Sequence, residues 1–234
     1  HQAQQAQTQQ HSAETPLSTA NTLLNALASG DTSSPALQAF LADPNGAADE
    51  LERTVTKLGF KGAMLHGMTN GEFLDYKKYW PLYERAEKLD VPIYFHPSLP
   101  HPKVTEIYYQ DYAKDFPLVV RPGWGYTVET ATQAIRLVLS GVFDAHPKLK
   151  IILGHNGEGL PFVMERMNAH TVMDARRRKL KKTPFEYLRD HLIVTTSGNF
   201  STPALICSIL EMGVDRILFS VDWPFVDNPP GTDW

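Results

Sequence analysis

Apolar and polar positions follow two rhythms along the chain from about residue 46 onward. Short, nearly continuous apolar runs predict buried strands, and longer segments with an apolar residue every three or four positions predict helices. Segment 127–147 is the strongest helix pattern, because Ala131, Ile135 and Val138 share one stripe. The predicted strands are 60–65, 91–96, 149–154, 192–196 and 216–221, and a helix pattern separates each from the next except where noted below.

Three segments depart from this rhythm. Residues 97–123 are rich in Pro and Tyr and predict a long loop, and residues 38–42 give only a weak sixth strand. Residues 1–35 are dominated by Gln, Ser and Thr, and carry one amphipathic helix pattern at 18–28. Since this lead-in has too little apolar mass to fold alone, we expect the folded catalytic domain to occupy residues 36–234.

Alternating strands and helices predict an α/β fold with a parallel sheet. The predicted strands are apolar on both faces, as a covered parallel sheet requires. The two alternatives are an open doubly wound sheet and a closed barrel. Neither of the glycine-rich phosphate-binding motifs that would favour a nucleotide-binding open sheet is present.

Composition narrows the function classes. The chain carries 22 Lys and Arg against 26 Asp and Glu, so its net charge of −4 gives no reason to expect nucleic acid or an anionic membrane as a partner. A single cysteine, Cys207, excludes an internal disulfide. No apolar stretch approaches the roughly 20 residues of a membrane span. Because no secretory signal pattern is present either, we expect a reducing, cytoplasmic setting.

Chemically capable side chains follow the predicted strands. His96 ends the second strand, His155 and Glu158 follow the third, and Asp222 follows the fifth. In a parallel barrel these ends meet at one mouth, where active sites lie. Two histidines and an aspartate there predict a divalent metal site or an acid–base pair.

Each residue also has an ordinary structural interpretation. A histidine after an apolar strand often serves only as a hydrogen-bonded structural group, and Asp222 before Trp-Pro suits a turn. Glu158 suits the first turn of a helix. The basic run at 176–182 is typical of a solvated helix end, and the aromatic residues between Tyr94 and Tyr126 are either core residues or a flat lid over an aromatic substrate.

Four motifs together resemble one known family. They are FHP at 95–97, the long block at 125–162 containing GHNGE, TTSGNF at 195–200 and SVDWPF at 220–225. They are similar to the amidohydrolase-related, metal-dependent decarboxylases, nearest to the 2,3-dihydroxybenzoate, γ-resorcylate and salicylate enzymes and more distant from the aminocarboxymuconate-semialdehyde decarboxylases. The resemblance covers about 21–225. It implies a (β/α)8 TIM barrel and reversible, non-oxidative decarboxylation of an ortho-hydroxybenzoate.

The resemblance also implies roles for particular residues. His96 and Asp222 match metal ligands, and the ion is expected to be zinc, or else manganese or magnesium. Asp222 is also expected to pass a proton to the ring, beside the His155–Glu158 pair. Arg166 matches an arginine that binds the substrate carboxylate, sometimes across a subunit boundary, and Phe225 and Trp124 match pocket walls. The expected partners are a small aromatic carboxylate and further copies of the chain, as a homodimer or homotetramer.

The sequence departs from the family pattern at both ends. No strand ending in Glu-x-His precedes residue 21, and only 12 residues follow Asp222. We therefore expect a barrel without its first strand and last helix, and a site with only part of its metal ligands. Two alternatives to the decarboxylase remain: a hydrolase of a lactone or amide, and an inactive remnant that binds an intact paralogue.

Overall fold

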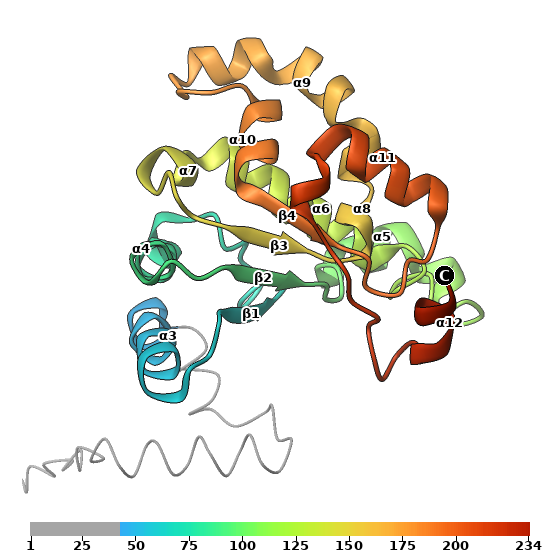
Figure 1. The fold of residues 1–234 in the computed structure, drawn as a ribbon. Coiled ribbons are helices and arrows are strands. Elements are labelled where there is room, and N and C mark those ends of the chain that lie inside the picture. The colour runs from blue at the N-terminus through green and yellow to red at the C-terminus, as the bar shows by residue number, and fades with distance from the viewer. Residues whose placement is uncertain (1–42) are drawn as a thin grey trace, which may run out of the picture. The chain divides into compact units, whose positions relative to one another are not determined.

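The computed structural model of the protein describes residues 43–234, so the predicted lead-in 1–35 and the weak strand 38–42 lie outside the described residues. Its centre is a five-stranded, all-parallel sheet in the order β1-β2-β3-β4-β5 (Figure 1). The strands are β1 (Ala63–His66), β2 (Ile93–His96), β3 (Ile151–Leu153), β4 (Leu192–Thr195) and β5 (Ile217–Leu218).

Strand order distinguishes the two topologies that the sequence left open. A doubly wound sheet reverses its strand order at a switch point, whereas a barrel adds each strand beside the previous one. Every strand here pairs in parallel with its neighbour in sequence. The predicted α/β fold is confirmed, and the described strands form an arc of the barrel kind.

Helices connect the strands and supply the outer layer. They are α3 (Pro44–Leu58), α4 (Trp80–Leu89), α5 (Pro102–Ala113), α6 (Gly125–Ser140), α7 (Val142–Ala145), α8 (His155–Glu158), α9 (Leu160–Arg177), α10 (Pro184–His191), α11 (Thr202–Met212) and α12 (Asn228–Asp233), with short 3-10 turns at Lys77–Tyr79 and Val214–Arg216. Among these helices, none combines the length and the hydropathy that a bilayer crossing requires.

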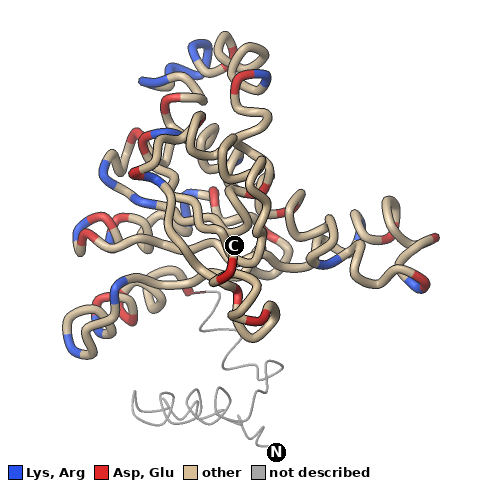
Figure 2. Tube along the Cα trace, turned by 45° about the vertical axis from the view of Figure 1, so that its right-hand side comes forward, with Lys and Arg blue, Asp and Glu red and all other residues tan. Residues whose placement is uncertain are grey.

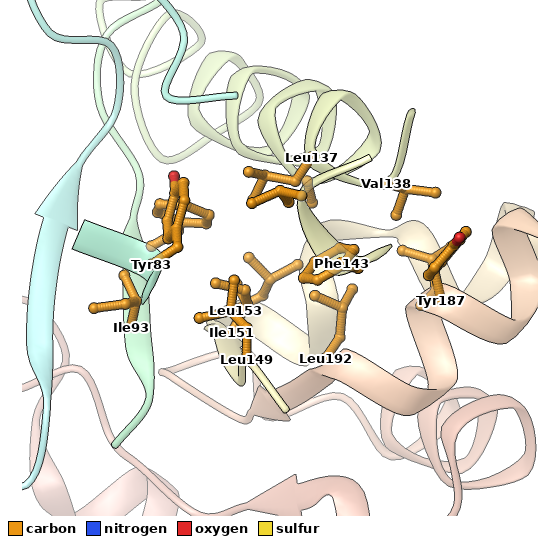
Figure 3. Close-up of a cluster of buried hydrophobic side chains, with 14 of the residues drawn as sticks. Tyr83, Ile93, Leu137, Val138, Phe143, Leu149, Ile151, Leu153, Tyr187 and Leu192 are labelled. Carbon is orange, nitrogen blue, oxygen red and sulfur yellow. The ribbon is translucent and has the colours of Figure 1, made fainter. Parts of the chain in front are cut away.

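The hydrophobic core lies on one face of the sheet. Alternate strand residues are fully buried there, among them Ile93, Ile151 and Leu153, while Met64 and Leu218 on the opposite face are 53% and 45% exposed. Figure 3 shows the buried strand residues packed against Leu137 and the neighbouring side chains of the covering helices. The helices therefore cover the outer face of the arc, as in a barrel, and leave the inner face of the described strands open.

Two predictions for the segments between the strands are wrong for local reasons. The predicted loop 97–123 contains α5, which begins at Pro102, and the His101 ring accepts a hydrogen bond from the Lys103 amide at its start. The predicted helix 127–147 is broken at Gly141, whose φ of +89° is left-handed. Because a left-handed residue ends an α-helix, α6 stops at Ser140 and α7 begins a separate turn.

Helix α10 was missed, although its sequence carries a start signal. Thr183 and Glu186 form a reciprocal capping box with Pro184 in the first turn, and the spacing T-x-x-E is typical of that cap. The basic run at 176–182 marks the end of α9, and Figure 2 shows its Lys and Arg residues gathered at that end. Arg176, Arg178 and Lys179 are exposed there, as the interpretation as a solvated helix end requires.

One carboxylate is buried within helix α6 without full hydrogen bonding. Glu129 is 6% exposed, and within the described part of the chain its Oε1 has no hydrogen-bond partner, nor does Nε2 of Gln133 one turn later. Burial raises the pKa of Glu129 to about 7, because removal from water disfavours the charged form more than nearby Arg136 favours it.

Truncation of the core should cost much more than truncation of the surface. Replacing the fully buried Leu153 with Ala leaves a cavity and is expected to lower the free energy of unfolding by about 2–5 kcal/mol. Leu210→Ala, at a position that is 76% exposed, is the matched control and should change it by no more than about 0.5 kcal/mol. Urea denaturation measures both, and equal effects would contradict the one-sided core.

Glu129→Gln should stabilise the chain at neutral pH. A carboxyl whose pKa is raised by folding binds its proton more tightly in the folded state, so stability falls as pH rises from about 4.5 to above 7. The expected loss is up to about 3 kcal/mol. Urea denaturation at pH 5 and pH 8 measures this loss, with Glu84→Gln at an exposed position of α4 as control. A variant no more stable than wild type at pH 8 would refute the burial argument.

Candidate active site

The carboxyl ends of the five strands meet at one edge of the sheet. His66 and His96 are the last residues of β1 and β2, and His155 follows β3 by two residues. Asp222 lies four residues beyond the end of β5. A cavity of about 470 Å³ opens at this edge, and its lining includes His155, Glu158 and Asp222, the three residues that the sequence predicted as catalytic.

A chain of polar contacts links these three side chains. His155 Nδ1 lies 2.6 Å from Glu158 Oε1, and His155 Nε2 lies 3.7 Å from Asp222 Oδ2. The second carboxylate oxygen of Glu158 accepts a hydrogen bond of 2.8 Å from the hydroxyl of Thr127, on α6. The side chain of Glu158 is only 1% exposed, whereas that of Asp222 is 26% exposed to the cavity. Glu158 therefore holds the imidazole from behind, and Asp222 faces its other nitrogen.

This arrangement favours a protonated imidazole. Burial by itself would lower the pKa of His155, but the hydrogen bond and charge of Glu158, followed by Asp222, raise that pKa above its ordinary value. A carboxylate on each side stabilises the imidazolium. His155 is therefore suited to hold a proton next to the Asp222 carboxylate.

An unusual turn places His155 and Glu158 together. All four residues of α8 have positive φ, between +52° and +82°, and Gly159 continues the left-handed backbone at +73°. A left-handed conformation costs an L-residue roughly 1–2 kcal/mol, and three residues other than glycine adopt it here. Strain of this size persists only where surrounding contacts impose it, and it is typical of functional sites.

Reciprocal amide bonds hold this turn in place. Asn156, which is 3% exposed, donates through Nδ2 to the Asn199 carbonyl at 2.8 Å. Asn199 donates in return to the His155 carbonyl at 3.2 Å. Ser208 on α11 donates to the Asn156 carbonyl at 3.1 Å. The loop after β4 and helix α11 thus fix the strained turn that carries His155.

The two histidines that end β1 and β2 lie against each other with their rings tilted by 42°. The rings of His66 and His96 lie 4.5 Å apart, and the strand register places the residues side by side. His96 Nδ1 lies 2.8 Å from the Pro97 carbonyl, which accepts only, so Nδ1 carries the proton and Nε2 keeps its lone pair. Burial, and then His96, lower the pKa of His66. The pair therefore brings two imidazole rings together at the carboxyl edge of the sheet.

The other predicted site residues lie outside the cavity lining. Trp124 immediately precedes α6 and is 54% exposed, and Phe225 is 80% exposed. Arg166 lies on an exposed position of α9. Neither these three side chains nor His96, the predicted metal ligand, lines the 470 Å³ cavity of the described chain. Their assignment to substrate binding stays a prediction.

Four residues that line the site received no site role from the sequence. Tyr126 and Thr127 come from the first turn of α6, and Ser197 and Asn199 come from the loop after β4. The loop after β4 had a signal, since it follows an apolar strand as His96 does. Thr127 had none, because its role depends on the packing of α6 beside α8. A larger, mainly apolar groove of about 730 Å³ lies next to the site, between α9 and α11.

Known proteins resemble the chain over most of its length. The sequence model of the amidohydrolase family matches residues 1–234. A γ-resorcylate decarboxylase of Rhizobium radiobacter is 44% identical over 202 residues, which are 83% of this chain and 60% of that protein. The chain spans about 60% of the length of the curated relatives it matches.

Solved structures share the fold. The 2,6-dihydroxybenzoate decarboxylase from Rhizobium superimposes with a TM-score of 0.72 and 40% identity, over 83% of this chain and 61% of that one. The dihydroxybenzoic acid decarboxylase from Polaromonas sp. JS666 was solved with manganese and the inhibitor 2-nitroresorcinol. It superimposes with a TM-score of 0.74 and 39% identity, over 92% of this chain and 66% of that one. Together with the family match over residues 1–234, these likenesses show that the chain belongs to the amidohydrolase family.

Proposed function

We propose that the chain carries the catalytic residues of a non-oxidative decarboxylase that acts on an ortho-hydroxybenzoate of the dihydroxybenzoate or salicylate type. One observation carries the proposal: His155, Glu158 and Asp222 converge on a single cavity at the carboxyl edge of the sheet. The likeness to γ-resorcylate decarboxylases supports the choice of substrate class. The reverse reaction, carboxylation of a phenol, follows from the same chemistry.

The reaction requires protonation of an aromatic carbon. A proton from Asp222 adds to the ring carbon that bears the carboxylate, and the bond from that carbon to the carboxylate then breaks. Its electron pair returns to the ring, which regains aromaticity as CO2 leaves. His155, held protonated between two carboxylates, restores the proton to Asp222. Glu158 holds the imidazole in position throughout, as a buried carboxylate does for a catalytic histidine.

We propose a divalent metal beside these groups, with His96 and Asp222 among its ligands. The donor types fit, since His96 Nε2 has a free lone pair and Asp222 supplies a carboxylate. Within residues 43–234, however, no three His, Cys, Asp or Glu side chains cluster closely enough to hold an ion. These residues therefore provide part of a ligand set. When bound, the ion supplies Lewis-acid polarisation of the substrate oxygens.

The family resemblance and the relatives support a choice among three ions. Zinc is the ion expected from the sequence resemblance, with manganese or magnesium as alternatives. Manganese is the ion in the Polaromonas structure. Imidazole suits zinc well, while carboxylate and phenol oxygens also suit manganese.

Substrate binding and assembly belong to the same proposal. Trp124 and Phe225 would wall the aromatic ring, and Arg166 would bind its carboxylate through a bidentate fork. Arg166 is exposed on α9, and Phe162 on the same helix is 86% exposed beside the apolar groove. These exposures support a homodimer or homotetramer in which α9 meets another copy. The single cysteine supports a reducing, cytoplasmic setting.

Loss of the Asp222 carboxyl group should abolish proton delivery. With 2,6-dihydroxybenzoate as substrate, Asp222→Asn is expected to lower kcat by about 10²–10⁴-fold, measured as resorcinol and CO2 released. Asp190→Asn, an exposed position paired with Lys182, is the matched control and should keep wild-type turnover. Salicylate and 2,3-dihydroxybenzoate are assayed in parallel. Turnover of a lactone or amide by the wild type, without any decarboxylation, would instead support the hydrolase alternative.

His96→Ala should weaken metal binding. Removal of one imidazole ligand is expected to raise the Kd for Zn²⁺ or Mn²⁺ at least tenfold, about 1.4 kcal/mol. Isothermal titration of the full chain with each chloride salt measures the Kd. His170→Ala, on the exposed face of α9, is the control and should bind as wild type does. Equal affinity of both variants would remove His96 from the proposed ligand set.

A further inference from the structure

The segment that carries Asp222 is held by side-chain hydroxyls after the strand ladder ends. The pairing of β4 with β5 stops at Thr195 and Leu218, followed by one backbone bond from the Thr196 amide to the Leu218 carbonyl at 3.1 Å. Beyond it, Thr196 Oγ1 donates to the Ser220 carbonyl at 2.6 Å and accepts from the Ser220 amide at 3.0 Å. The Thr196 hydroxyl thus takes the place of the two main-chain groups that would pair with Ser220 in a continuing strand ladder.

A third hydrogen bond joins the same two segments. The Ser197 amide donates to Ser220 Oγ at 3.2 Å. Thr196 and Ser197 are 3% and 5% exposed, so water has little access to replace these bonds. Buried main-chain groups that lose their partners are costly. The Thr196–Ser220 clamp, meaning these three hydrogen bonds, therefore sets where the chain runs two residues before Asp222.

A cluster of side-chain hydroxyls from β2, from β4 and from the loop after it contacts the residues of the clamp. Ser220 Oγ lies 3.0 Å from Ser197 Oγ and donates to Thr195 Oγ1 at 3.0 Å. Tyr94, from β2, reaches across β3 to place its hydroxyl 2.9 Å from Ser197 Oγ. Gly154 makes this reach possible, because a Cβ there would lie 2.8 Å from the Tyr94 oxygen. The clamp is thereby tied to strands β2, β4 and β5 together.

The clamp ends two residues before Asp222, and a tight turn follows directly after it. Asp222 itself has a left-handed φ of +74°, and its carbonyl accepts from the amides of Phe225 and Val226 at 2.9 and 3.1 Å. A Cβ at Gly198, in the loop after β4, would lie 3.3 Å from Asp222 Cβ. Asp222 is therefore fixed on its N-terminal side by the clamp and on its C-terminal side by this turn.

We propose that Thr196 and Ser220 are positioning residues that hold the Asp222 carboxylate opposite His155. Their hydroxyls touch no reacting atom, and they act by fixing the backbone that carries the carboxylate. The inference rests on the proposed function of Asp222 as proton donor. It also explains why the TTS motif at 195–197 and the SVD motif at 220–222 carry hydroxyl residues.

Amide hydrogen–deuterium exchange of the full chain tests the clamp without any need for activity. Thr196→Val keeps the shape of the side chain and removes both hydrogen bonds to Ser220. We expect the amides of residues 219–226 to exchange at least tenfold faster than in wild type, while β3 and β4 keep their protection. Thr196→Ser, which retains the hydroxyl, should restore protection to within about twofold.

Two further variants separate the clamp from a general packing defect. Thr130→Val replaces an equally buried threonine on α6 and should leave residues 219–226 unchanged. Ser220→Ala removes only the side-chain hydroxyl and keeps the main-chain bonds to Thr196, so it should accelerate exchange of the same segment by a smaller factor. It also provides the test if Thr196→Val does not fold.

The outcomes divide clearly. Faster exchange confined to 219–226, with rescue by Thr196→Ser, supports the clamp. Wild-type exchange in Thr196→Val and Ser220→Ala, or acceleration spread evenly over the whole sheet, overturns it. In the decarboxylation assay Thr196→Val should lower kcat about tenfold with KM little changed. Confined faster exchange in a chain that shows no decarboxylation would retain the clamp and reject the proposed function instead.

Discussion

The common direction of the five strands is the constraint on which the rest of the structure depends. Each strand enters the sheet beside its predecessor and in parallel, so every carboxyl end reaches the same edge. Side chains that are up to 156 residues apart in sequence, from His66 to Asp222, consequently share one surface. The covering helices stabilise only the outer face, which concentrates apolar burial there and leaves the polar groups at the edge.

Local strain and local hydrogen bonding are balanced at that edge. The left-handed turn of α8 and the left-handed Asp222 both cost conformational energy, and the loop after β4 packs against both segments. Asn199 secures the first, and Thr196 together with Gly198 secures the second. The loop after β4 therefore contacts both the turn that carries His155 and the segment that carries Asp222. One short loop therefore supports both His155 and Asp222, the two residues of the proposed proton path.

Much of this architecture was predictable from local patterns. Buried strands appear as apolar runs, and His96, His155 and Asp222 stand out because they follow such runs directly. The errors arose where a local signal was weak or ambiguous. The sequence of helix α5 resembles a loop because its Pro and Tyr residues obscure the helical period. Most of its large apolar side chains are exposed, such as Ile107 at 73%. Strand β5 is shorter than its apolar run because hydroxyl side chains replace the ladder after Leu218.

The sequence by itself determined the alternation of strands and helices, the parallel sheet and the identity of the chemically capable side chains, because those depend on periodicity and on position relative to strand ends. Only the tertiary structure decided that Thr127 bonds Glu158, and that Arg166 and Phe225 stay outside the cavity. It also decided that Asn156 donates to the Asn199 carbonyl while Asn199 donates to the His155 carbonyl. Such contacts join segments from different elements, and their geometry follows from helix packing and backbone handedness, which no local sequence pattern encodes.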